Sequence, residues 1–118
     1  MSETKRGYYN NGQLAYEYPY VNGKLHGTRR YWHDNGQLWY ERPYVGGKAH
    51  GIHRYWYDNG QLRYEWPCVN GKPHGIHRYW DYQGKLINTE HYLYGDQVTQ
   101  AQYRKHELIT ELSGLNDE

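Results

Sequence analysis

The fold is decided by one stretch of the sequence that recurs at a fixed spacing. It reads Asp58-Asn59-Gly60-Gln61-Leu62-Arg63-Tyr64-Glu65-Trp66-Pro67-Cys68-Val69-Asn70-Gly71-Lys72-Pro73-His74-Gly75. Nearly the same stretch occupies residues 34–51, and a looser copy occupies residues 10–27. One of its glycines recurs every 24 residues, at Gly12, Gly36, Gly60 and Gly84. A constant period of this length is typical of repeat proteins, so the sequence predicts four units, at residues 7–30, 31–54, 55–78 and 79–98.

Each unit contains two turn signals with an alternating, strand-like sequence between them. The first is the Asn-Gly pair, as in Asn59-Gly60, and the second is Asn70-Gly71 and its copies. Asn-Gly accepts the positive φ values of a type I′ turn, so we expect a two-residue hairpin turn that sets Tyr57 opposite Leu62. Each unit is therefore predicted to be a pair of short antiparallel strands.

Recurring charges and prolines refine this hairpin. The same register sets an arginine opposite a glutamate in three units, as Arg54 with Glu65, Arg30 with Glu41, and Arg6 with Glu17. Each such cross-strand pair contributes about 0.2–1 kcal/mol. Three units also carry a proline in mid-strand, at Pro19, Pro43 and Pro67. Proline donates no ladder hydrogen bond, so we expect these strands to bend, bulge or stop pairing there.

The composition indicates a thin structure without a deep core. Only 36% of the 118 residues are hydrophobic, and the aromatic residues are 16 Tyr and 5 Trp with no Phe. Tyr and Trp suit surfaces that are packed on one side and wet on the other. The net charge of +1 gives no global attraction to nucleic acid or anionic lipid. A single cysteine, Cys68, and the lack of a long apolar run lead us to expect a cytoplasmic location.

The last unit gives way to a different pattern. Thr99 and Gln102 have the spacing of a capping box, which predicts a helix over residues 99–113 that Gly114 ends, followed by a tail at 114–118. Its apolar face is expected to hold Tyr103, Leu108, Ile109 and Leu112. An open sheet end needs a cap, and the helix is expected to supply one. Residues 1–6 are polar and are expected to be disordered or to form an edge strand.

The segment Asn70-Gly71-Lys72-Pro73-His74-Gly75, its copies and the flanking aromatic residues resemble the MORN repeat. The Asp-Asn-Gly-Gln-Leu segment is similar to the MORN-variant subclass of bacterial proteins, some of them antitoxin-like, and of large DNA viruses. The resemblance implies an all-β repeat fold, an elongated, twisted antiparallel sheet of consecutive β-hairpins with a groove, here with a C-terminal capping α-helix. MORN repeats occur as protein scaffolds, as membrane-linking modules and as appendages to enzymes.

No set of residues indicates catalysis, a cofactor or a metal. The serines lie near the termini, and no glycine-rich loop suits phosphate. Histidines recur before a glycine at His26, His50 and His74, with His53 and His77 three residues after the last two. Residues three apart on a strand point to opposite faces, and no Cys or acidic set completes a site. We therefore interpret these histidines as structural and expect the protein not to be an enzyme.

The aromatic residues are the best candidates for binding. We predict that Tyr40, Tyr55, Tyr64, Trp66 and His77 share one sheet face and form a groove-like site for a partner protein. The partner is another protein or a second copy in a homodimer; anionic lipid is the alternative, and nucleic acid is disfavoured. On the other face, Trp32, Trp56 and Trp80 accompany Arg30, Arg54 and Arg78. That stripe suits an anion or a stacked base, but glutamates opposite the arginines favour a structural role.

Overall fold

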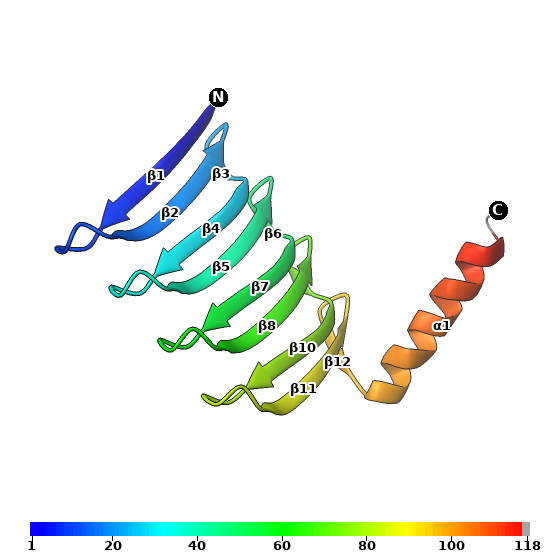
Figure 1. Cartoon of the computed structure of the whole chain (residues 1–118). Helices are drawn as coiled ribbons and strands as arrows, with labels where there is room; N and C mark the ends of the chain where they lie inside the picture. Colours follow the sequence, from blue (N-terminus) through cyan, green and yellow to red (C-terminus); the bar gives the residue numbers. More distant parts are fainter. Residues whose placement is uncertain (117–118) are drawn as a thin grey trace.

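The computed structural model describes residues 1–116, which form one twisted antiparallel sheet and one helix (Figure 1). The predicted fold class is confirmed. The strands are β1 (Ser2–Tyr8), β2 (Leu14–Val21), β3 (Lys24–Leu25), β4 (Gly27–Trp32), β5 (Leu38–Val45), β6 (Lys48–Ala49), β7 (Gly51–Trp56), β8 (Leu62–Val69), β9 (Lys72–Pro73), β10 (Gly75–Trp80), β11 (Leu86–Leu93) and β12 (Asp96–Val98). The helix α1 spans Gln100–Asn116. Long strands from successive hairpins lie side by side in chain order, and β3, β6 and β9 each add a short third strand to a hairpin.

The N-terminus is an ordered edge strand. β1 pairs with β2 over its whole length, and the Met1 amine donates a hydrogen bond to Asn22 Oδ1 at 2.7 Å. Of the two alternatives for residues 1–6, the edge strand is therefore the one that the structure has. The 24-residue repeat explains this, because Thr4 and Arg6 occupy the same repeat positions as Thr28 and Arg30, which lie in strand β4.

The first turn of each hairpin differs from the prediction. In the third unit Gly60 has φ +88° and donates its amide to Tyr57 O at 3.0 Å, whereas Asn59 does not have positive φ. This is a type I turn closed by a glycine bulge. The bulge shifts the register, so that Trp56 rather than Tyr57 pairs with Leu62. The type I′ geometry occurs instead at the second turn, where Asn70 has φ +51° and Gly71 has φ +82°.

Between the bulge and the far end of the hairpin, away from the first turn, the predicted register is confirmed. Arg54 pairs with Glu65 as predicted, and Tyr55 pairs with Tyr64. In the last hairpin, which has no glutamate at this position, Arg78 faces Thr89. The equivalent pairs in the earlier units are Arg30 with Glu41 and Arg6 with Glu17.

The prolines interrupt pairing between successive hairpins. β5 pairs with β6 near its end and with β7 nearer its start, and the two paired stretches are separated by a break. His50 N donates to Pro43 O at 3.0 Å within this break. A residue's N and C=O point to the same side of a strand, so the missing proline N–H faces the break. Gly51 has φ +110°, and a Cβ there would lie 2.8 Å from Pro43 Cγ, so the proline ring packs against the glycine.

The sheet is a single layer with almost no buried interior. The only buried large apolar side chain in the described residues is Tyr40, which is 6% exposed. The molecule measures 54 × 42 × 24 Å, and its radius of gyration is 17.3 Å. A compact domain of this length would have a radius of about 13.5 Å. The thin, half-buried structure predicted from the Tyr-rich composition is thus confirmed.

The helix begins as predicted and continues further. Thr99 N donates to Gln102 Oε1 at 2.8 Å, and Gln102 N donates to Thr99 Oγ1 at 3.1 Å, which is a reciprocal capping box. Gly114 does not end the helix, which continues to Asn116. No helix in residues 1–116 is long and apolar enough to cross a membrane.

The helix follows β12 at the C-terminal end of the sheet and projects away from it (Figure 1). Tyr103 packs against His91, with ring centroids 5.3 Å apart, and His106 lies against Tyr94 at 5.7 Å. The rest of the expected apolar face is uncovered. Its residues are 47%, 53% and 60% exposed at Leu108, Ile109 and Leu112, respectively. Up to residue 113, the helix therefore caps the sheet through its first two turns.

Candidate functional site

One face of the sheet carries a continuous row of tyrosines, which we call the tyrosine row. Its members are Tyr16, Tyr31, Tyr40, Tyr55, Tyr64 and Tyr79, each paired across the strands with the next. Their ring centroids are 6.1, 4.8, 4.7, 4.4 and 6.0 Å apart in that order. Strand residues alternate between faces, so one position in each of the six strands β2, β4, β5, β7, β8 and β10 builds the whole row.

The structure brings the five predicted site residues together on this face. Tyr40, Tyr55 and Tyr64 belong to the tyrosine row, Trp66 stacks on Tyr64 at 4.3 Å, and the ring of His77 stacks on Trp66 at 5.9 Å. Tyr40 and His77 are only 6% and 5% exposed. Neighbouring side chains therefore cover most of both, although each lines a hollow, and the half-buried Tyr55, Tyr64 and Trp66 supply more of the accessible area.

A second row runs beside the tyrosine row, and we call it the variable row. It consists of Lys5, Tyr18, Arg29, Arg42, His53, Trp66, His77 and Glu90. The tyrosine row repeats one residue type, whereas the pair of residues in the variable row differs in every hairpin. Within each hairpin its two residues are direct cross-strand partners, as Arg29 is of Arg42 and His53 is of Trp66.

The arginine pair of the variable row was not predicted as a site. The Arg29 guanidinium lies 4.7 Å from the Tyr18 ring centre and donates to Tyr31 Oη at 2.9 Å. Arg42 donates to Tyr44 Oη at 3.2 Å. Neither arginine forms an ion pair with a carboxylate of residues 1–116. The Nε atoms of both are buried without a hydrogen-bond partner in that part of the chain.

His53 continues the variable row beside these arginines. It is 5% exposed, and neither ring nitrogen has a hydrogen-bond partner within the described residues. Burial lowers its pKa to about 4, and the charge of Arg42, that of His77 when protonated and that of Arg29 act in the same direction. His77 differs, because its Nε2 lies 3.1 Å from Pro67 O; burial nevertheless lowers its pKa as well. Both rings are thus held as neutral imidazoles at pH 7.

Two hollows open on this face. One, of about 260 Å³, lies between Arg29, Tyr31, Trp39, Tyr40 and Tyr55. The other, of about 310 Å³, is lined mainly by the aromatic residues and histidines of the third and fourth hairpins, with Cys68 at its side. Both are walled by rings, so the face offers apolar recesses with polar tips.

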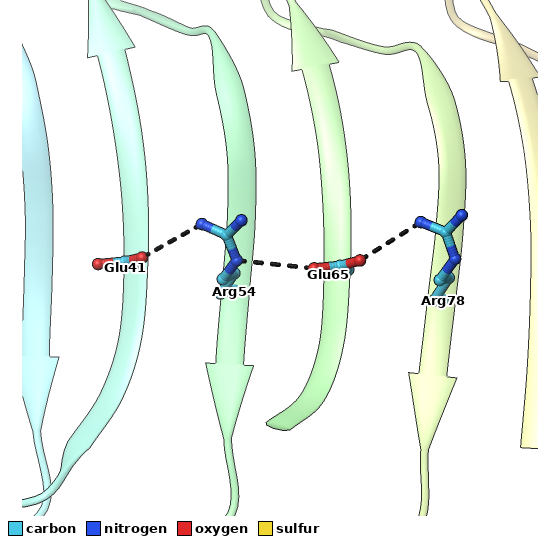
Figure 2. Close-up of polar contacts among 4 residues, drawn as sticks. All are labelled: Glu41, Arg54, Glu65 and Arg78. Atoms are coloured by element: carbon cyan, nitrogen blue, oxygen red, sulfur yellow. Dashed lines mark hydrogen bonds and ion pairs between the residues drawn. The ribbon is translucent and has the colours of Figure 1, made fainter. Parts of the chain in front are cut away.

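The opposite face carries an unbroken ladder of ion pairs. Figure 2 shows its central part, in which Arg54 lies between Glu41 at 3.5 Å and Glu65 at 3.6 Å, and Glu65 also contacts Arg78 at 3.4 Å. Arg30 bridges the first two hairpins in the same way. Since these guanidinium groups are already held by carboxylates, the ladder supports a structural role over anion or base binding.

The histidines before the glycines join neighbouring units. The Nδ1 atoms of His26, His50 and His74 accept hydrogen bonds from the backbone amides of the next second turn, at 3.3, 3.4 and 3.0 Å. This bonding supports their interpretation as structural residues. No group of three or more His, Cys, Asp or Glu in the described range is placed to hold a metal ion.

Comparison with known proteins agrees with the repeat. The family described as MORN repeat variant matches residues 4–22, 25–45 and 49–70, which together make up more than half of the chain. These matches fall on three consecutive units. No curated protein and no solved structure matches the chain.

Proposed function

Because the chain belongs to the MORN repeat variant family, we propose that it binds another protein. The proposed contact surface is the sheet face that carries the tyrosine row and the variable row, which we call the aromatic face. MORN repeats are commonly protein-interaction or membrane-interaction modules, and the family is a non-enzymatic repeat. The observation that carries the proposal is the contrast between the two sheet faces. One is saturated by its own ion pairs, and the other offers ring-walled hollows and half-buried Tyr and Trp side chains.

The chemistry of the aromatic face suits a protein surface or segment. Tyr and Trp give large, rigid contact areas at low entropy cost, and their polar tips bind hydrogen-bonding groups of a partner. A tyrosine hydroxyl is protonated at neutral pH and can donate a hydrogen bond, and burial raises the pKa of Tyr64 further above its usual value. Tyr64 lies between Tyr55 and Trp66, at the centre of the accessible aromatic area.

Charge favours a protein over a membrane as the partner. Binding to anionic lipid needs several uncompensated basic residues on one surface. The chain has 14 basic and 13 acidic residues, and four of its arginines are engaged in the ion-pair ladder. Pelleting with phosphatidylserine vesicles distinguishes a protein partner from a membrane. Strong, salt-sensitive binding to the vesicles would make the membrane the favoured partner.

Two forms of this function are consistent with the resemblance stated above. In the first the module neutralises a cytoplasmic partner, as an antitoxin does, and in the second it scaffolds one. We also propose self-association, because β1 pairs on one side only and leaves the other edge open. Light scattering tests it, and a protein that stays monomeric at high micromolar concentration would exclude a homodimer.

The contact surface is tested by comparing variants of the two faces. A partner is captured from the native host, purified, and measured directly against each variant. Tyr64→Ala should weaken binding by more than about 1 kcal/mol, roughly fivefold. Arg54→Ala, which changes the ladder face, is the matched control and should bind normally. Thermal melts of both variants separate lost contact from lost folding; the reverse pattern in folded variants would assign binding to the ladder face.

A further inference from the structure

We propose that Arg29 and Arg42 form a carboxylate site on the aromatic face, which receives an Asp or Glu side chain from an acidic segment of the partner protein. The inference rests on the proposed function and adds the chemistry that selects the partner. It concerns the second hairpin alone, where Arg29 lines the hollow between the tyrosines and Arg42 is its direct cross-strand partner. The two guanidinium carbons lie 5.7 and 5.8 Å from the centre of the Tyr40 ring.

The first argument is that this pair of charges is not compensated. Arg29 and Arg42 are direct cross-strand partners, an arrangement that is destabilising for like charges. The ladder arginines each contact a carboxylate, but these two contact tyrosine hydroxyls and rings. Their Nε–H groups are buried and without a partner in the described residues. A bound carboxylate would accept from both guanidinium groups and remove the repulsion.

The second argument comes from comparing the four hairpins with one another. Residues that build the fold recur every 24 positions, as the tyrosines and the ladder arginines do. The two positions of the variable row hold Lys5 and Tyr18, then Arg29 and Arg42, then His53 and Trp66, then His77 and Glu90. Since folding does not require one residue type there, the double arginine is not needed to form a hairpin. A binding role accounts for its presence despite its cost.

The third argument concerns the surroundings of the pair. His53 follows Arg42 in the row, and both of its ring nitrogens lack a partner within the described residues although the ring is 5% exposed. Unsatisfied buried polar atoms are therefore concentrated at three consecutive members of the variable row, Arg29, Arg42 and His53. The rings of Tyr18 and Tyr31 wall the other side of Arg29. Such a recess admits a side chain from an extended segment better than a flat headgroup layer.

The geometry favours an acidic peptide over a phosphate-bearing surface. Planar guanidinium groups bind carboxylate and phosphate alike. A membrane or a nucleic acid, however, presents many phosphates and is bound by broad basic patches. Here the cationic part of the row is short, and it ends at the neutral His53 and Trp66. One or two carboxylates flanked by apolar residues match a surface of two arginines among tyrosines.

The test uses a variant that copies the next hairpin. Arg29→His together with Arg42→Trp gives the second hairpin the residues that the third holds at His53 and Trp66, so the fold accepts them. The probe is a fluorescein-labelled peptide of alternating glutamate and glycine, read by fluorescence anisotropy. The wild-type protein should bind it in a salt-sensitive way, and the double variant at least about tenfold more weakly with an equal or higher melting temperature. Lys48→Gln with Lys72→Gln, two exposed lysines at second turns, removes the same charge and should bind as the wild type does.

Further arms decide the ligand chemistry. A peptide of alternating glutamine and glycine should not bind; equal binding of both peptides would overturn the proposal. Two outcomes would instead assign the pair to phosphate. One is displacement of the glutamate peptide by a low concentration of inorganic phosphate, and the other is binding to phosphatidylserine vesicles that requires Arg29 and Arg42. If a captured partner binds Tyr64→Ala weakly but the double variant normally, the proposed function stands and the carboxylate site is wrong. If it binds both normally, the aromatic face is not the contact surface.

Discussion

Lowering the pH to about 5 should loosen the middle of the sheet, because His53 is buried there as a neutral imidazole. Its folded-state pKa of about 4 lies below the ordinary value of 6.5. The unfolded chain therefore takes up the proton first as the pH falls. Stability is unaffected above about pH 6.5, decreases below it, and stops decreasing on this account below about pH 4. His77, whose pKa is also lowered, acts in the same direction.

The size of the effect follows from linkage. For a pKa of about 4 in the folded state and 6.5 in the unfolded state, the free energy of unfolding falls by about 2 kcal/mol between about pH 7.5 and pH 5. The charges that oppose protonation are Arg42 and Arg29, from the neighbouring hairpin, and protonated His77. Removing those charges should reduce the loss.

Urea unfolding followed by tryptophan fluorescence measures the loss at the two pH values. His53→Gln, which cannot take up a proton, should lose about 2 kcal/mol less than the wild type over the same interval. His106→Gln, on the helix, is the matched control and should keep the wild-type difference. If His53→Gln and the wild type lose the same stability, the imidazole is not held neutral by burial and the reasoning fails.

Two further predictions concern the backbone and the helix. Gly51→Ala, at φ +110°, places a Cβ 2.8 Å from Pro43 Cγ, whereas in Gly12→Ala, at φ +86°, the Cβ meets nothing within 4 Å. Gly51→Ala should therefore lower the melting temperature more than Gly12→Ala does. Equal decreases would show that the contact between Gly51 and Pro43 does not contribute. Deleting residues 99–118 uncovers His91 on β11, next to the edge strand β12, so we expect aggregation in light scattering. A truncated protein that stays soluble with an unchanged melting temperature would favour the helix as a partner-binding element.

The turns illustrate how far sequence reasoning reaches. Asn59-Gly60 correctly marks a hairpin, but the turn is not type I′, and the reason lies in the neighbouring unit. Asn59 Nδ2 donates to Tyr82 O at 2.9 Å, and Asn59 Oδ1 accepts from Gln61 N at 2.9 Å. These bonds hold the asparagine side chain between successive turns, while Gly60 alone takes positive φ. A local turn signal does not contain such a contact, because its partner lies 23 residues away.

The site follows the same division. The tyrosine row could be predicted from alternation and register, since Tyr55 and Tyr64 are close in the chain and pair in one hairpin. The ion pairs between neighbouring hairpins, such as Arg54 with Glu41, depend on how the hairpins stack and were missed. The arginine pair was missed for another reason. Its signal is that the repeat positions of Arg29 and Arg42 hold a different pair of residues in each unit, whereas fold-building positions keep one residue type. This contrast is visible only when residues 24 apart are compared.

The helix was the least predictable element. Its first turn is encoded locally by Thr99 and Gln102, so the capping box could be read directly. Where the later turns pack depends on the shape of the last hairpin. Leu108 and Leu112 have the spacing of a buried stripe, but the single-layer sheet offers them no surface to cover.

Because the sheet has one layer, each hairpin touches only the hairpins before and after it, and the molecule has no centre that every unit must share. Inserting or deleting one 24-residue unit would preserve every kind of contact in the array and change the length of the aromatic face by two strand spacings, about 9.6 Å. An inserted unit would add its own pair of residues to the variable row and shift the pairs that follow it along the sheet. A lineage of such proteins can therefore alter the length and the reading order of its binding surface by duplication alone, without redesigning a core.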